Sequence, residues 1–280
     1  MKPLKGARPI IDLECSNHYT NHIFKKYTVK EYANIFYNWI NNSKDKTILG
    51  LDKFTNQHYT QGTSQTFDNF VMRNSQRQIV NFLGDFQYHA CIARHCDHKI
   101  ITDVNELHNG QSLIISLPFS DTGQQHNEFD QIIQRCNQLD IPVCLDIAYW
   151  GIAKNIDIDL DQCPCIKEVT CSLSKPFANL EKHRIGIRFC RDYTNDGICM
   201  INEVNMFNDW SISLGIWFMN KFSNSFNWEK YSEKYIKTIE QLELQSTNTV
   251  IFGVSKDKYR EFNRGLPNNN RVCISEFLQK

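Results

Sequence analysis

Two nearby segments, IPVCLDIAYWG (141–151) and VTCSLSKPFANLEKHRIGIRF (169–189), carry the clearest structural pattern in this chain. The short apolar runs within them, Pro142–Leu145 and Val169–Leu173, are predicted to be buried strands of a parallel sheet. Each run delivers polar residues at or near its carboxyl end, which is where open α/β sheets bind ligands. The pattern therefore predicts a ligand site at this edge of the sheet.

Three residues at these strand ends, Asp146, Tyr149 and Lys175, suit one kind of chemistry. A lysine just past a strand can form a Schiff base with a carbonyl compound. A carboxylate beneath a pyridine nitrogen keeps that nitrogen protonated, so that the ring acts as an electron sink. A phenol can donate a hydrogen bond to an oxygen on the ring. Each residue alone has an ordinary structural explanation, and it is their joint order and spacing that indicates a function.

The order D-x-x-Y, S-x-S-K and R-x-G resembles the fold-type I pyridoxal-phosphate enzymes, the aspartate aminotransferase superfamily, in a chain shorter than typical members. The resemblance implies that Lys175 forms the Schiff base with pyridoxal 5'-phosphate, that Asp146 pairs with the pyridinium nitrogen, and that Tyr149 contacts the ring hydroxyl. It also implies that Ser172 and Arg184 hold the phosphate of the cofactor.

The spacing between Lys175 and Arg184 departs from the commoner pattern of that superfamily. Nine positions separate the two residues, which is one more than usual, so a one-residue bulge is expected between them. Lys182 and Arg188 are the alternatives to Arg184 for the phosphate contact.

A second phosphate contact is predicted in QGTSQTFDNFVM (61–72). Gly62 permits close approach of the backbone, and Thr63 and Ser64 open a helix. The free amides and the dipole at a helix N-terminus favour an anion. An ordinary helix cap is the alternative interpretation, but the segment resembles the first phosphate-binding turn of the superfamily. Gly62, Thr63 and Ser64 are therefore phosphate candidates.

Two ring contacts are also implied by the resemblance. An aromatic residue that follows the phosphate turn stacks on the pyridine ring in the superfamily, and Tyr88 is the nearest match, with His89 as the alternative. After a predicted strand at 112–117, PFSDTG resembles the P-x-N-P-T-G turn. Ser120 stands where the asparagine that contacts the ring hydroxyl is usual, and Asp121 replaces the proline. Serine is shorter and is expected to reach the ring through water.

The late segment NNNRVCISEFL resembles the R-(V/I)-x-(V/I) strand in which an arginine holds the α-carboxylate of the substrate. Arg271 is the match, and a planar guanidinium suits bidentate binding of a carboxylate. A surface arginine at the start of a strand is the alternative interpretation. Arg264 is the next candidate for the carboxylate contact.

The resemblance and the order of elements predict an α/β fold, a three-layer sandwich around a mostly parallel sheet with a reduced α+β domain at the C-terminus. The expected parts are an N-terminal arm and helix (1–60), a cofactor-binding large domain (61–195), and interface helices with the small domain (196–280). Helices are predicted at 28–41, 127–139 and 228–244, and late strands at 249–252 and 271–275. Residues 42 to about 59 are expected to be loop, and 78–94 a strand, a break at Gly84–Asp85 and more extended chain.

Composition narrows the class of protein. The chain has 280 residues, 41% of them hydrophobic, and a formal net charge of zero, so no general attraction to nucleic acid or membranes is expected. No signal-peptide or membrane-spanning run is found, which predicts a cytoplasmic protein. The cysteines lie mostly in apolar segments and no metal site is expected. The aromatic run 207–226 predicts a homodimer, because large apolar patches mark partner sites.

These observations together predict a pyridoxal-phosphate-dependent aminotransferase that acts on an amino acid and a 2-oxo acid. Lys175 would hold the cofactor and then move the α-proton as a base. Two alternatives stay open: another reaction with the same cofactor, such as a lyase, decarboxylase or side-chain transfer reaction, and a non-catalytic binding module on this fold. No G-x-G-x-x-G or P-loop lysine motif follows a strand, which counts against a nucleotide-binding protein.

Overall fold

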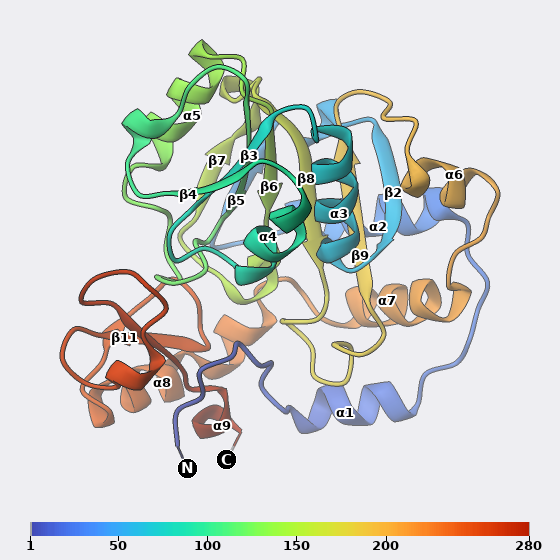
Figure 1. Cartoon of the computed structure of the whole chain (residues 1–280). Helices are drawn as coiled ribbons and strands as arrows, with labels where there is room; N and C mark the ends of the chain where they lie inside the picture. The colour runs from blue at the N-terminus through green and yellow to red at the C-terminus, as the bar shows by residue number, and fades with distance from the viewer. Residues whose placement is uncertain (1, 280) are drawn as a thin grey trace.

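A seven-stranded sheet forms the centre of the computed structural model, which describes residues 2–279 (Figure 1). In chain order its strands are β2 (Asn56–Gln61), β3 (Gln78–Phe82), β4 (His98–Ile101), β5 (Gln111–Ser116), β6 (Val143–Asp146), β8 (Ile166–Ser172) and β9 (Ile185–Cys190). Across the sheet they follow the order β2-β9-β8-β6-β5-β3-β4. All neighbours from β8 to β4 are parallel, whereas β9 is antiparallel to both β8 and β2. The apolar runs of the sequence, β5, β6 and β8, thus lie next to one another in the middle.

Helices cover both faces of this sheet and make it the middle of three layers. On one face lie α3 (Thr63–Arg73) and α4 (Gln87–Ile92), and on the other lie α2 (Val29–Asn41), α5 (Phe129–Gln138) and α7 (Asp209–Lys221). Successive side chains of β5 point to opposite faces of the sheet, so that Ile114 packs on the α3 side while Leu113 and Ile115 pack on the other side. The helices predicted at 28–41 and 127–139 are confirmed as α2 and α5.

Two segments differ from the prediction. Residues 56–59, expected to be loop, belong with Thr60 and Gln61 to the edge strand β2, because the backbone of 56–61 pairs with β9 along the whole segment and an edge strand tolerates polar side chains. The chain after Gly84, expected to be extended, turns at this glycine, where φ is 89°, and returns as the helix α4. Glycine suits this left-handed conformation because it has no Cβ. The turn carries Asp85 to the end of β5 and His89 to the end of β6.

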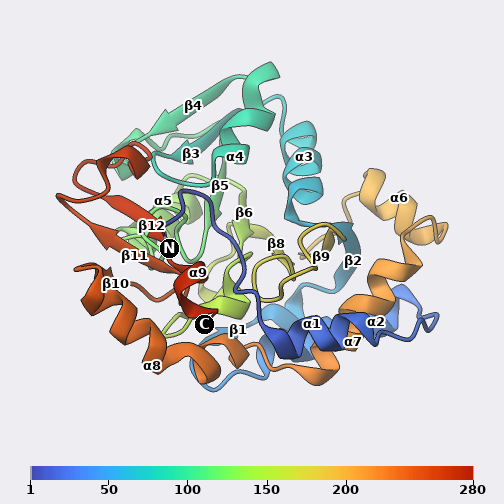
Figure 2. The same ribbon diagram turned by 90° about the horizontal axis from the view of Figure 1, so that it is seen from below.

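A smaller C-terminal unit packs around its own apolar core. It contains α8 (Phe226–Gln241), β10 (Gln245–Ser246), β11 (Phe252–Ser255), β12 (Asn270–Cys273) and α9 (Ser275–Leu278). The strand predicted at 249–252 begins instead at Phe252, because the N–H of Thr249 donates to the Thr247 hydroxyl at 3.1 Å and bends the chain there. Leu4 pairs antiparallel with Cys273, and the N-terminal segment then crosses the carboxyl edge of the central sheet (Figure 2).

The aromatic run 207–226 packs mainly inside the chain, so the prediction that it covers a partner is not supported by its burial. Within α7, Leu214, Ile216 and Phe218 are fully buried in the core that includes α2 and β9. Within the run, Trp210 is the large hydrophobic residue that is exposed. The homodimer therefore stays a prediction from the resemblance. No helix among residues 2–279 is long and apolar enough to span a membrane.

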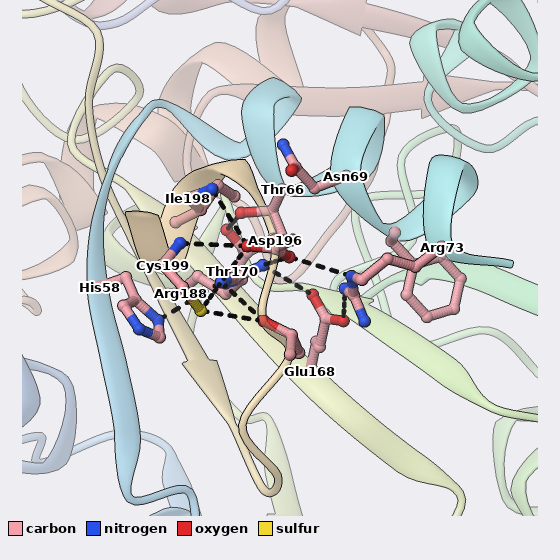
Figure 3. A network of polar contacts seen from close by, with 12 residues as sticks. His58, Thr66, Asn69, Arg73, Glu168, Thr170, Arg188, Asp196, Ile198 and Cys199 are labelled. Carbon is pink, nitrogen blue, oxygen red and sulfur yellow. Dashed lines mark hydrogen bonds and ion pairs between the residues drawn. The ribbon is translucent and has the colours of Figure 1, made fainter. Parts of the chain in front are cut away.

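A buried network of charged side chains joins α3, β8, β9 and α6 (Gly197–Glu203) (Figure 3). The Arg188 guanidinium on β9 is fully buried and donates to the two carboxylate oxygens of Asp196 at 2.5 and 3.0 Å. Arg73 lies 3.0 Å from Asp196 and also pairs with Glu168 on β8. Burial opposes ionisation of Asp196, but Arg188 outweighs burial and holds the pKa of Asp196 well below the usual carboxyl range. Arg188 is committed to this network and is therefore a poor alternative for the phosphate contact.

Replacing Arg188 by methionine is expected to lower the free energy of unfolding by about 3–5 kcal/mol, because the buried Glu168 and Asp196 would keep only the partly exposed Arg73 as a counter-charge. Urea unfolding at pH 7 measures the change. Because the folded-state pKa of Asp196 is depressed, the stabilisation is fully present above about pH 4 and is lost as the pH falls further.

The exposed Lys258–Glu243 pair provides the matched control for this prediction. Lys258→Met removes a cation from an ion pair of the surface and is expected to cost less than about 1 kcal/mol. Similar losses for Arg188→Met and Lys258→Met at pH 7 would show that the buried network contributes no more than a surface pair.

Candidate active site

A cavity of about 290 Å³ opens at the carboxyl ends of β5, β6 and β8. Of the site residues predicted from the sequence, those that line it are Thr63, Ser64, Tyr88, Ser120, Asp146, Tyr149, Ser172, Lys175 and Arg184. The lining also includes residues that the sequence analysis did not select, namely Phe86, Ser116, Pro118, Ala148 and Ser174. Side chains from five separate segments of the chain thus meet at the edge where a ligand site is expected.

One end of the cavity can bind an anion. Arg184 donates from Nη2 to Ser64 Oγ at 2.5 Å, beside Thr63 in the first turn of α3. The backbone at Gly62 has φ 73°, and a Cβ there would lie 2.7 Å from Arg184 Nη2, so glycine leaves the space that the guanidinium occupies. The guanidinium and the free amides at the start of the helix both attract negative charge.

The loop from β8 to β9 brings a lysine and two serines to the same end. Ser172 and Ser174 lie with their hydroxyl oxygens 3.0 Å apart, and Lys175 follows directly. Arg184, at the end of the loop, adopts a left-handed φ of 53°. Lys182 is exposed and does not line the cavity.

Asp146 is the last residue of β6 and is held in a fixed orientation. Its Oδ1 accepts a hydrogen bond from the N–H of Ala148 at 2.9 Å, and its Oδ2 lies 3.7 Å from Nε2 of the fully buried His89. Burial is the largest influence on this carboxyl group and raises the pKa of Asp146, opposed by the contact with His89. Tyr149, three positions on, packs its ring edge-on against Phe252 at 5.3 Å.

The aromatic wall of the cavity comes from the N-cap and the first turn of α4. Phe86 and Tyr88 both line the cavity, with ring centroids 6.2 Å apart, and Tyr88 donates its hydroxyl proton to Asp68 at 3.0 Å. His89, the alternative to Tyr88 as a stacking residue, lies behind this wall with its edge toward Phe67 and Phe86. Phe86 is a further candidate for stacking. Its place directly after the predicted break at Gly84–Asp85 is the only signal for it in the sequence.

The N-terminal segment supplies backbone carbonyl groups to two of the cations that were predicted to belong to the site. Lys175 Nζ donates to the carbonyl of Ala7 at 3.1 Å. Arg271, fully buried on β12 and outside the cavity lining, donates to the carbonyls of Ser120 at 2.6 Å and Lys5 at 3.0 Å. Its guanidinium also lies 4.0 Å from the ring centroid of Phe252. These contacts could not be predicted from the sequence, because a backbone carbonyl leaves no pattern in it.

Several polar groups at the cavity are without partners. The hydroxyl groups of Ser116 and Ser120 and both ring nitrogens of His89 have no hydrogen-bond partner among residues 2–279. Buried polar groups are seldom left unpaired, so the two hydroxyls that line the cavity suit a polar ligand there. Within the same residues, no group of three or more His, Cys, Asp or Glu side chains is placed to hold a metal ion.

The arrangement of the chain is similar to solved structures of aminotransferases and of a C-S lyase. A PLP-bound C-S lyase from Staphylococcus hominis aligns with a TM-score of 0.71 at 11% identity, over 98% of this chain and 87% of that chain. Tyrosine aminotransferase from Leishmania infantum aligns with a TM-score of 0.66 at 12% identity, over 98% and 89%. Aspartate aminotransferase from Thermus thermophilus aligns with a TM-score of 0.66 at 10% identity, over 96% and 86%.

No protein-family model matches the sequence, and no curated protein matches it either. The structural likeness, at such low identity, establishes the fold. The chain has the fold-type I architecture of the pyridoxal-phosphate-dependent transferases, and the predicted fold class is confirmed.

Proposed function

We propose that this chain, built on the fold of the fold-type I transferases, binds pyridoxal 5'-phosphate at Lys175 and works as an aminotransferase on an amino acid and a 2-oxo acid. The observation that carries the proposal is that Lys175, Asp146 and Arg184 line one cavity. They offer an amine for the aldehyde carbon, a carboxylate for the ring nitrogen and a cation for the phosphate. Solved PLP-bound structures of the same fold support this choice of cofactor.

The cavity residues fit this cofactor from end to end. The phosphate would lie at Arg184 and Ser64, close to the first amides of α3 and to Ser172. The ring would lie against the aromatic wall of Phe86 and Tyr88, with the unpartnered Ser120 hydroxyl available to its polar substituents. These residues would hold the group at both its charged and its aromatic parts.

When bound, pyridoxal phosphate supplies an electron sink for the electrons released at the α-carbon of a substrate. Lys175 Nζ would hold it until the substrate amine takes its place, and the freed amine would then move the α-proton. The Asp146 carboxylate would keep a proton on the ring nitrogen, and the Tyr149 hydroxyl would donate a hydrogen bond to the ring oxygen. The chain thus supplies a base, a counter-charge and an orienting phenol.

Arg271 is the candidate for binding the α-carboxylate. It lies beside Ser120, which lines the cavity, and its Nε has no hydrogen-bond partner within residues 2–279. A substrate carboxylate would replace the Lys5 carbonyl as acceptor, because a hydrogen bond between two charged groups is stronger than one to a neutral carbonyl. A buried, oriented guanidinium positions the substrate for reaction at the α-carbon.

A second reaction class is favoured by one observation, the likeness to a C-S lyase. A lyase releases its product from a single amino acid without any acceptor, whereas an aminotransferase leaves the cofactor in its amine form until a 2-oxo acid arrives. Incubation of the purified protein with single amino acids, with and without a 2-oxo acid, separates the two. New amino acid formed only with the acceptor supports the proposal, and steady release of ammonia or thiol without it supports the lyase.

Arg184→Ala is expected to weaken retention of pyridoxal phosphate by about ten- to a hundred-fold, because it removes charge-assisted hydrogen bonds to the phosphate. Dialysis followed by absorbance of the retained cofactor measures the effect. Lys182→Ala, on the same loop but exposed, is the matched control and is expected to retain the cofactor as the unchanged chain does. If both variants lost the cofactor equally, Arg184 would not be the residue that binds the phosphate.

Arg271→Ala is expected to leave the cofactor in place and to lower kcat/KM for amino acids by about tenfold or more, because one charged positioning contact is lost. Amines that lack a carboxylate would lose less, since only substrates that use the contact are penalised. Steady-state kinetics with both substrate types measure the difference. If amino-acid turnover is unchanged while Arg264→Ala lowers it, the carboxylate contact belongs to Arg264.

A further inference from the structure

Behind Asp146, the side chains of His89 and Asp85 form a row that leads away from the cavity. His89 Nε2 lies 3.7 Å from Asp146 Oδ2, and His89 Nδ1 lies 3.6 Å from Asp85 Oδ2. All three residues are buried, His89 completely. One imidazole therefore lies between two carboxyl groups, out of contact with solvent.

Asp85 is oriented by the backbone around it. Its Oδ1 accepts from the N–H of Phe86 at 2.7 Å, and its Oδ2 accepts from the N–H of Ser116 at 3.0 Å. These hydrogen bonds aim Oδ2 at the imidazole from the side opposite Asp146. Because both hydrogen bonds are donated by backbone N–H groups to the carboxylate oxygens, they also favour the ionised form of Asp85.

The charges in this region determine which protonation state the row adopts. Two carboxylates without a cation between them would be costly in a buried place. The other titratable groups near Asp85 are Asp121 and His126 from the segment after β5, and Arg264 from the loop before β12. Neither His126 nor Arg264 forms an ion pair with Asp85 among residues 2–279. His89 is the group that contacts both carboxylates.

The direction of the pKa shifts agrees with this geometry. Burial opposes a charged imidazole, but the two carboxylates, Asp85 foremost, outweigh burial and raise the pKa of His89 to about 9. Burial likewise opposes ionisation of Asp85, and His89 together with the two amide donors lowers its pKa. Asp146 accepts from one backbone donor, and burial raises its pKa while the contact with His89 opposes that rise.

We propose that Asp85 is a positioning residue that keeps His89 protonated and directed at Asp146, so that Asp146 presents a carboxylate to a pyridine nitrogen in the cavity. The role of the row toward the cofactor rests on the proposed function, whereas the charge of His89 is a property of the chain alone. Without Asp85, the imidazole of His89 would be neutral. Asp146 would then be a buried carboxyl group without a cation beside it, and burial favours the protonated form of such a group.

Nitrogen-15 NMR of the imidazole groups in the full chain, with no cofactor added, tests the charge directly. At pH 8 the spectrum is expected to show His89 protonated on both nitrogens, because its pKa is raised to about 9. In Asp85→Asn the titration midpoint of His89 is expected to fall by at least one pH unit. Asp97→Asn, which removes a carboxylate from the surface end of β4, is the control and is expected to leave it unchanged.

A neutral His89 at pH 8 in the unaltered chain overturns the proposal, and this result does not depend on whether any variant folds. An unchanged midpoint in folded Asp85→Asn overturns it as well. A chain that binds no pyridoxal phosphate but has a charged His89 would contradict the proposed function. The effect of Asp85 on the charge of His89 would not be contradicted by that result.

Cofactor binding separates positioning from a merely structural role. Asp85→Asn is expected to weaken binding of pyridoxal phosphate about tenfold, the affinity change that corresponds to one pKa unit. The 1-deaza analogue, in which carbon replaces the ring nitrogen, is expected to bind the unaltered chain and Asp85→Asn equally, because it has no ring nitrogen with which Asp146 could pair. Equal weakening for both compounds would mean that Asp85 only supports the local backbone, and would overturn the proposal.

Discussion

Lys175→Ala is expected to abolish covalent retention of pyridoxal phosphate and to lower kcat/KM for transamination by at least about 10²–10⁴-fold, the usual contribution of a general acid–base group. Within residues 2–279, Lys175 is the only lysine that lines the cavity, which it shares with Asp146 and with Arg184 of the anion site. One substitution therefore removes both the amine that would hold the cofactor and the base that would move the α-proton.

The control for this prediction is Lys182→Ala, because Lys182 is an exposed lysine of the same loop. Its substitution is expected to change turnover by less than about twofold, as is usual for surface positions without a special contact. Turnover by Lys175→Ala within tenfold of the unaltered chain, together with a cofactor that survives denaturation, would show that another residue holds the group.

Asp146→Asn is expected to lower kcat/KM by about 10²–10³-fold, the scale of losing one preorganised electrostatic group at a reaction centre. An amide keeps the shape and can still accept from the N–H of Ala148, but it carries no charge for a ring nitrogen. The substitution also removes one of the two anions beside His89, so the pKa of His89 is expected to fall from its raised value of about 9.

Asp157→Asn is the matched control for Asp146→Asn, since it removes an exposed carboxylate from β7 (Asp157–Asp159), outside the cavity. It is expected to leave kinetics and the titration of His89 unchanged. If Asp146→Asn retains full kcat/KM, the ring nitrogen does not depend on this carboxylate, and the orientation of the cofactor in the cavity would have to be different.

The sequence could predict the middle of the sheet and the polar residues at its edge because both leave local patterns. Short apolar runs identify buried parallel strands, and Asp146 and Lys175 are polar residues where such runs end. Gly62, Thr63 and Ser64 combine a glycine with hydroxyl residues before a periodic apolar helix. In each case the residues that carry the signal are neighbours in the chain.

The features that escaped prediction depend on contacts between distant segments. The edge strand β2 is polar and is a strand only because β9 pairs with it. The helix α4 is short and has no side-chain cap, so nothing local distinguishes it from extended chain. The row of Asp85, His89 and Asp146 joins a turn, a helix and a strand end, and it exists only after these have packed together.

The two arginines near the end of the β8–β9 connection illustrate the same limit. Arg184 and Arg188 stand four positions apart, and spacing alone leaves both open as phosphate ligands. The fold places the two side chains differently. Arg184 has a left-handed backbone conformation and its side chain reaches Ser64, whereas Arg188 on β9 is buried with Asp196. The two arginines differ in burial, which depends on packing between distant segments and cannot be read from their spacing.

Reduction of the purified protein with borohydride after incubation with pyridoxal phosphate, followed by peptide mapping, tests the central claim most directly. Borohydride converts a carbon–nitrogen double bond between the cofactor and a lysine into a stable single bond. The account predicts one modified peptide, with the pyridoxyl group on Lys175. A protein that takes up no cofactor, or an adduct spread over exposed lysines with none at Lys175, would contradict it.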